Sequence, residues 1–177
     1  MLGRIVEFLV STLADLLAFV LLLRLFMQAT RTSFANPLGE IVIALSNWIV
    51  RPLRRALPPL GPIDSASLLP AWLAQWLALV LILVTRGADL PMVPLLWVAL
   101  VETLRIAVWV WVIALLAMAI ISWVNPYSPF ASPIAQLTRP ILRPIQRVMP
   151  TVGRLDLSPL VAILLLQVLL IVLDGLR

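Results

Sequence analysis

Residues 5–27, IVEFLVSTLADLLAFVLLLRLFM, decide the class of fold. A helix of roughly 20 apolar residues crosses the hydrocarbon core of a bilayer, and this stretch reaches that length. It is too long and too charged for a cleavable signal peptide, and no small-residue cleavage site follows it. We therefore expect a retained transmembrane helix over about residues 5–28.

The composition of the whole chain agrees with that expectation. The 177 residues are 63% hydrophobic and only 12% charged, whereas soluble domains carry about 25% charged residues. Much of the surface must therefore face something other than water. Further apolar stretches at about 67–85, 95–124 and 157–173 predict three more spans. The expected fold is an all-α membrane protein with about four transmembrane helices.

Two basic, proline-rich loops, residues 29–66 and 125–156, separate the predicted spans. Placing Gly61 on Gly153 aligns the loops without a gap. Further pairs at this offset are Arg51 with Arg143, Pro58 with Pro150, Asp64 with Asp156, and Gln75 with Gln167. We infer two tandem repeats, residues 1–88 and 89–177, each made of a helix, an amphipathic Arg/Pro loop and a helix.

Each loop contains a segment whose structure the sequence leaves open. Residues 38–50 are apolar but too short to span easily, so they are re-entrant, interfacial or packed on the bundle. Residues 130–149 are re-entrant or interfacial, and Pro140 and Pro144 weaken any regular helix there. Arginines concentrate in both loops, so the positive-inside rule places the loops in the cytoplasm and both termini outside. The two repeats then have the same orientation, as in a parallel duplication.

Two sets of loop residues are candidates for function. Six arginines could bind lipid phosphates or an acidic partner, or act only as a topology signal with snorkelling side chains: Arg51, Arg54, Arg55, Arg139, Arg143 and Arg147. Six residues form predicted turns and caps: Pro58, Gly61, Asp64, Pro150, Gly153 and Asp156. Each of these aspartates precedes a helix, which predicts capping and pairing with an arginine. A buried proton or cation site is the alternative.

A third set consists of polar residues within the spans: Asp15, Arg24, Gln75, Glu102, Arg105 and Gln167. A charge at mid-membrane costs roughly 2.5–3.5 kcal/mol, so each needs a partner or access to the interface. Glu102 and Arg105 are three residues apart and can pair within one helix. We expect Asp15 to lie deep and Arg24 to snorkel at the cytoplasmic end of its span. The two glutamines are expected to bridge helices through hydrogen bonds.

The chain contains no Cys and no His. Their absence excludes zinc sites built on those ligands, thiol chemistry and His-based acid/base catalysis. The sequence also lacks a Walker motif, a GxSxG motif and a nucleotide-binding fingerprint. We therefore expect no enzymatic activity, no cofactor and no metal. The net charge of +5 is explained by anionic lipid headgroups and loop topology, and we expect no nucleic acid partner.

The loops resemble those of the YggT family of small bacterial membrane proteins, which has relatives in cyanobacteria and plastids. The resemblance rests on residues 51–67, RPLRRALPPLGPIDSAS, on residues 143–159, RPIQRVMPTVGRLDLSP, and on the Ser122-Trp123 pair. Arg54 corresponds to Gln146, so the second loop departs from the first by one charge. The resemblance implies a multi-pass inner (plasma) membrane protein of a bacterium, so the positive-inside rule places both termini in the periplasm. It also implies links to osmotic stress, to division and, in plastid relatives, to cytochrome maturation.

Three functions remain open from the sequence. The first is a non-enzymatic scaffold, assembly or stress-adaptation protein whose loops bind lipid headgroups, a membrane-protein partner or a second copy of the chain. The others are a small transporter or channel component in osmotic or ion homeostasis, and a haem or cytochrome maturation factor. A conduit predicts that Asp15, Arg24 and the two glutamines converge on one cavity. A scaffold predicts that they pair off separately and that the basic loops form an exposed plate.

Overall fold

A computed structural model of the protein describes residues 2–57, 64–89, 91–148 and 157–177. Within these ranges the chain is helical and forms no strand, so the all-α prediction is confirmed. The helices are α1 (Leu2–Ala29), α2 (Pro37–Ala56), α3 (Ser65–Thr85), α4 (Met92–Val124), α5 (Ala131–Val148) and α6 (Ser158–Asp174).

Three helices in the described part of the chain are long and apolar enough to cross a membrane. They are Gly3–Ala29 within α1, all of α3, and the 33-residue α4. The apolar α6 has 17 residues, which is at the lower end of the length that a span needs. Three of the predicted spans therefore coincide with suitable helices, and the fourth span stays a prediction.

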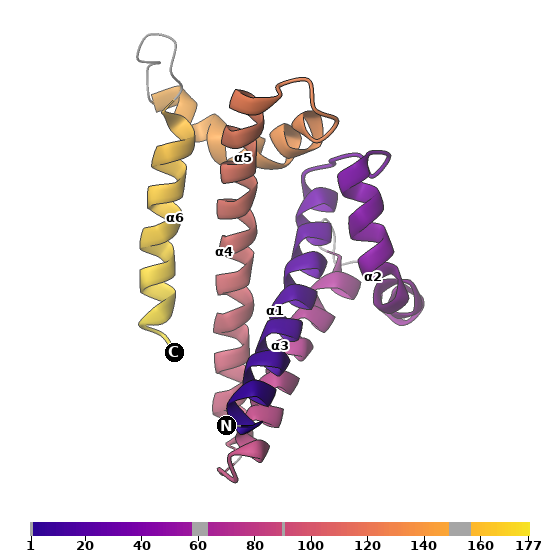
Figure 1. Ribbon diagram of the computed structural model, residues 1–177, viewed down its shortest axis with the longest axis vertical. Helices are drawn as coiled ribbons and strands as arrows, with labels where there is room; N and C mark the ends of the chain where they lie inside the picture. Colours follow the sequence, from indigo (N-terminus) through magenta and orange to yellow (C-terminus); the bar gives the residue numbers. More distant parts are fainter. Residues whose placement is uncertain (1, 58–63, 90, 149–156) are drawn as a thin grey trace.

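The four apolar helices lie side by side and alternate in direction (Figure 1). The N-terminus, the C-terminus and the α3–α4 turn lie toward one end, while the α1–α2 and α4–α5 connections lie toward the other. Helix α1 packs along α3, and α4 contacts α1, α3, α5 and α6. Large apolar side chains such as Phe8, Leu13 and Leu164 remain exposed. Such an apolar surface fits a lipid environment better than water.

Helix α2 folds back against α1 and is the first of two helices within the predicted basic loops. Its N-cap is Asn36, whose Oδ1 accepts a hydrogen bond from the Gly39 backbone nitrogen at 2.9 Å, with Pro37 in the first turn. Val42, Ser46 and Val50 are buried. Residues 38–50 thus pack on the bundle, one of the three alternatives that the sequence left open.

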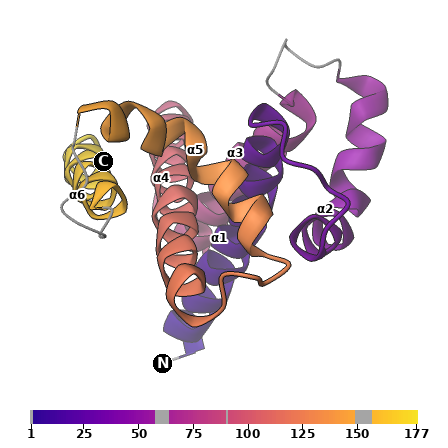
Figure 2. The ribbon, with the colours of Figure 1, turned by 90° about the horizontal axis from the view of Figure 1, so that it is seen from above.

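Helix α2 extends beyond the apolar segment 38–50, because it continues through Pro52 to Ala56. Figures 1 and 2 show that α2 bends along its length. An internal proline removes a backbone hydrogen bond and clashes with the preceding turn, which kinks a helix without necessarily ending it.

Helix α5 forms in the second loop although its prolines were expected to weaken any regular helix there. It is helical over Ala131–Val148 with Pro140 and Pro144 inside it. Viewed from above, it bends across the ends of α4 and α6 (Figure 2). Ile134, Leu137 and Leu142 are buried on its inner face, so packing against the bundle holds α5 in the helical conformation despite the prolines.

Candidate functional site

Arg24 of α1 is the most enclosed charge among the described residues of the spans. Its side chain is only 6% exposed. It donates to Ser46 Oγ at 2.6 Å and, through both terminal nitrogens, to Asn47 Oδ1 at 3.2 Å. The expectation that Arg24 snorkels is therefore wrong. Helix α2 covers the side chain of Arg24. Its residues Ser46 and Asn47 provide the polar contacts that the membrane interface was expected to provide.

Arg54 and Asp64 form an ion pair beside Arg24. Arg54 Nη2 lies 2.6 Å from Asp64 Oδ2 and also donates to Gln28 Oε1 at 2.8 Å, while Ser67 Oγ donates to Asp64 Oδ2 at 2.8 Å. Asp64 occupies the N-cap position of α3, but its side chain makes no capping hydrogen bond. Its carboxylate instead links the end of α2, through Arg54, to the start of α3, through Ser67. Arg54 also contacts Gln28 and so links the end of α2 to α1.

The environment of Asp64 favours its charged form. Burial by itself would raise the pKa of this carboxyl. The hydrogen bonds from Arg54 and Ser67, together with the positive charges of Arg54 and Arg24, outweigh burial and lower its pKa below the ordinary value. Asp64 is therefore a carboxylate, and a proton site at this position receives no support from these contacts.

A pocket of about 260 Å³ lies at the same junction, between α1 and α2. Its lining residues are Arg24, Gln28, Phe34, Ile43 and Arg54. Two guanidinium groups and one amide thus meet two apolar side chains. The combination is chemically suited to an anion with a small apolar or neutral attachment.

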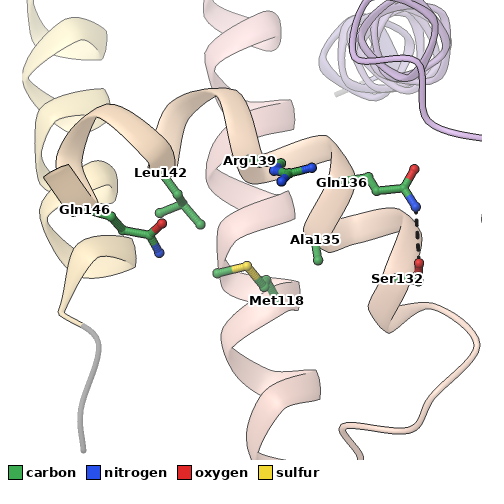
Figure 3. A pocket seen from close by; sticks show the side chains of 7 residues that line it. All are labelled: Met118, Ser132, Ala135, Gln136, Arg139, Leu142 and Gln146. Atoms are coloured by element: carbon green, nitrogen blue, oxygen red, sulfur yellow. Dashed lines mark hydrogen bonds between the residues drawn. The ribbon is translucent and has the colours of Figure 1, made fainter. Parts of the chain in front are cut away.

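A larger groove, of about 350 Å³, lies between α4 and α5 (Figure 3). Met118 comes from α4, and Arg139, Gln136 and Gln146 come from α5. Gln136 Nε2 donates to Ser132 Oγ at 3.2 Å. The groove is lined by polar side chains of α5 and by the apolar side chains of Met118, Ala135 and Leu142.

The arginines of α5 lie on the outer face of that helix. Arg139, Arg143 and Arg147 are all exposed, whereas Ile134, Leu137 and Leu142 are buried. No acidic residue occurs between positions 131 and 148. On α2, the other predicted loop arginines, Arg51, Arg54 and Arg55, are also exposed near its C-terminal end. The structure therefore provides two surfaces rich in arginine, one on each short helix.

The remaining polar residues of the spans are spread over separate places. Gln75, which is 4% exposed, donates from Nε2 to Asp15 Oδ1 at 3.0 Å and so links α3 to α1. Asp15 itself is exposed on the surface of the bundle, and its depth in the membrane stays a prediction. Gln167 of α6 is half-buried. Asp15 and Arg24 line different pockets.

Charged pairs also tie helices together at the end of the bundle that holds the termini. Glu102 Oε2 accepts from Arg105 Nη1 at 2.8 Å, as the three-residue spacing predicted. Arg105 Nε lies 2.9 Å from Asp174 Oδ1, and Arg177 Nε lies 3.1 Å from Glu102 Oε1. The last two contacts are close enough for ion pairs but lack hydrogen-bond alignment. This network connects α4 with α6 and the residues after it.

Several predicted site residues lie outside the described residues: Pro58, Gly61, Pro150, Gly153 and Asp156. Conversely, sequence reasoning missed Ser46, Asn47 and Gln28 as partners of the two arginines. The sequence did contain a signal for Ser46 and Asn47, because they form a polar pair within the largely apolar stretch 38–50. Gln28 shares a helical face with Arg24, which the four-residue spacing predicts.

Comparison with known proteins places the chain in a family. The CCB3/YggT family model matches residues 3–85 and again residues 97–177. The chain is 42% identical to the Escherichia coli (strain K12) protein named "Uncharacterized protein YggT", over 92% of this chain and 85% of the relative. It is 37% identical to a protein of the proC 3′ region of Vibrio alginolyticus, over 91% and 89% of the two chains. No solved structure gives a significant match. The chain belongs to the CCB3/YggT family.

Proposed function

We propose that this protein is a non-enzymatic membrane scaffold whose short helices α2 and α5 bind anionic lipid headgroups. The observation that carries the proposal is the orientation of α5. Its apolar face is occupied by packing within the bundle, so the face left exposed carries Arg139, Arg143 and Arg147. Arginines in such a position attract anionic lipid at about 1 kcal/mol for each charge near the membrane surface.

The tandem organisation and the orientation are part of this proposal. The family model matches the chain twice, in agreement with an internal duplication. Ser46 and Thr138, which fall at aligned positions, are both buried and donate to the carbonyl oxygen four residues earlier, at 2.5 and 2.9 Å. In this proposal α6 is the fourth span of an inner-membrane protein, both short helices face the cytoplasm, and both termini face the periplasm.

The separation of the polar residues supports a scaffold more than a conduit. Asp15 pairs with Gln75, and Arg24 pairs with Ser46 and Asn47. These groups do not share a pocket, whereas a conduit needs a continuous polar path. A direct check is solute or ion flux in proteoliposomes, because flux above that of empty vesicles would favour the transporter or channel alternative.

The test of the scaffold proposal is binding of a dansyl-labelled phosphatidylglycerol to the protein in neutral-detergent micelles, followed by energy transfer from tryptophan. The variant Arg143→Gln/Arg147→Gln should bind at least fivefold more weakly, because two arginines contribute roughly 1 kcal/mol each. Added salt should narrow the difference between wild type and variant.

The matched control is Arg4→Gln/Arg177→Gln, which removes the same net charge from the end of the bundle that holds the termini. It should bind the labelled lipid within about twofold of wild type, since exposed charges beyond a Debye length are largely screened. Equal losses in the two double variants would mean that net charge alone decides lipid binding, and the proposal would then be wrong.

A further inference from the structure

Arg24 is a buried positive charge, and its hydrogen-bond partners among the described residues are all neutral. Arg24 is 6% exposed and hydrogen bonds only to Ser46 and Asn47. None of the ion pairs among the described residues includes Arg24. Its Nε is buried and has no hydrogen-bond partner. A buried charge normally requires an opposite charge as well as hydrogen bonds.

A second cation reaches the same pocket from α2. Arg54 is bound to Asp64, but the described hydrogen bonds of Arg54 all use Nη2. Among the described residues around the pocket, two guanidinium charges therefore face the single carboxylate of Asp64. The pocket carries an excess of about one positive charge, and Arg54 has further N–H donors that a ligand could use.

The size and lining of the pocket narrow the class of ligand. About 260 Å³ is roughly the liquid volume of nine water molecules at about 30 Å³ each, so a phosphate group with a few attached atoms fits. Paired guanidinium groups match the several acceptor oxygens of a phosphate. Phe34 and Ile43 provide an apolar wall for whatever is attached. Arg24 also lies only five residues before the end of α1 at Ala29.

We propose that the pocket between α1 and α2 binds a phosphate-type anion, held by Arg24, Arg54 and Gln28. The ligand is either a phosphodiester headgroup of a lipid or a free phosphate. At the aligned positions, the second half lacks both arginines and the glutamine of α1. At the offset that places Arg51 on Arg143, Arg24 falls on Leu116, Gln28 on Ile120 and Arg54 on Gln146. The inference does not depend on lipid binding by α5.

The experiment uses the full chain in phosphate-free neutral-detergent micelles and two probes, inorganic phosphate and monomeric dihexanoyl phosphatidylglycerol. Binding is followed by ³¹P line broadening and by the rise of the unfolding midpoint with probe concentration, because a ligand of the folded state stabilises it. Wild type should bind at least one probe saturably. The probe that binds identifies the source of the phosphate group.

Arg24→Leu, which copies the residue of the second half, should weaken binding at least about tenfold, or 1.4 kcal/mol. Arg31→Gln removes an equal charge from the neighbouring α1–α2 connection and should stay within about twofold of wild type. If Arg24→Leu fails to fold, Gln28→Leu tests the same pocket without changing its charge and should weaken binding at least about threefold.

The inference is overturned if neither probe binds saturably with a dissociation constant below about 10 mM, which corresponds to a binding free energy of about −2.7 kcal/mol. It is equally overturned if the pocket variants and Arg31→Gln lose the same affinity. Arg143→Gln/Arg147→Gln should leave phosphate binding at this pocket within about twofold of wild type. Failure of lipid binding by the α5 arginines can therefore be distinguished from failure of phosphate binding by the pocket between α1 and α2.

Discussion

The carboxylate of Asp64 at the start of α3 lies 2.6 Å from the guanidinium of Arg54 at the end of α2. The aspartate is the enclosed partner, with a side chain 3% exposed, whereas that of Arg54 is 44% exposed. This pair joins the two ends of the segment that links α2 to α3. The ion pair therefore holds together the two ends of this part of the first Arg/Pro loop. The second half of the chain has the uncharged Gln146 at the position that corresponds to Arg54.

Asp64→Asn should destabilise the protein at neutral pH by about 1.5–3 kcal/mol, the usual contribution of a hydrogen bond to a charged group. The folded state lowers the pKa of Asp64, so its stabilisation is fully present above the ordinary carboxyl pKa of about 4 and disappears as the pH falls through the folded value. The free energy of unfolding, measured by denaturant titration in micelles, should converge for wild type and variant in acid.

The control for that titration is Asp89→Asn, which removes an exposed carboxylate between α3 and α4. It should change the free energy of unfolding by no more than about 0.5 kcal/mol, as is usual for surface substitutions. A wild-type to Asp64→Asn difference that persists unchanged to acid pH would show that the ion pair is not the source of the stability.

Gly39→Ala should destabilise the protein even though alanine is the better helix former. A Cβ at Gly39 would lie 2.7 Å from the carbonyl carbon of Phe34, so the α1–α2 connection would have to move. We expect a loss of about 1–3 kcal/mol, as for overpacking. Gly3→Ala, where nothing lies within 4 Å of the added carbon, should instead stabilise by up to about 1 kcal/mol. Thermal unfolding of both variants checks the opposite signs.

Asp15 and Gln75 should behave as a coupled pair. Gln75→Leu removes the donor at 3.0 Å from Asp15 Oδ1, and Asp15→Leu leaves a buried amide without its recorded acceptor. The double variant should therefore lose less stability than the two single losses added together. The coupling energy should be about 0.6 kcal/mol, the average for hydrogen bonds between membrane helices. Strict additivity in a double-mutant cycle would contradict the contact.

Glu102→Gln should loosen the end of α6 more than Asp174→Asn does. Glu102 contacts both Arg105 and Arg177 and its side chain is 15% exposed, whereas Asp174 contacts Arg105 and is 53% exposed. Exposed ion pairs contribute only about 0–1 kcal/mol, so the half-exposed aspartate should contribute least. Amide hydrogen exchange in the last turn of α6 is the measurement, and faster exchange in Asp174→Asn would reverse the expected order.

The sequence by itself determined the helical class and most of the helix positions. Apolar stretches long enough to cross a bilayer have one local solution, because a helix satisfies its own backbone hydrogen bonds where no water is present. The pairing of Glu102 with Arg105 followed from the same helical periodicity. The repeated Arg, Pro, Gly and Asp of the loops also indicated the family that the comparisons establish.

Only the tertiary structure decided which polar groups are enclosed. Arg24 is buried because α2 folds back and brings Ser46 and Asn47 to it from more than 20 residues along the chain, a contact that no local pattern specifies. Asp15 is exposed on α1, whereas its partner Gln75 on α3 is buried. The lengths of the apolar stretches determine where the helices lie in the sequence. The burial of a charged side chain depends instead on which other helix covers it.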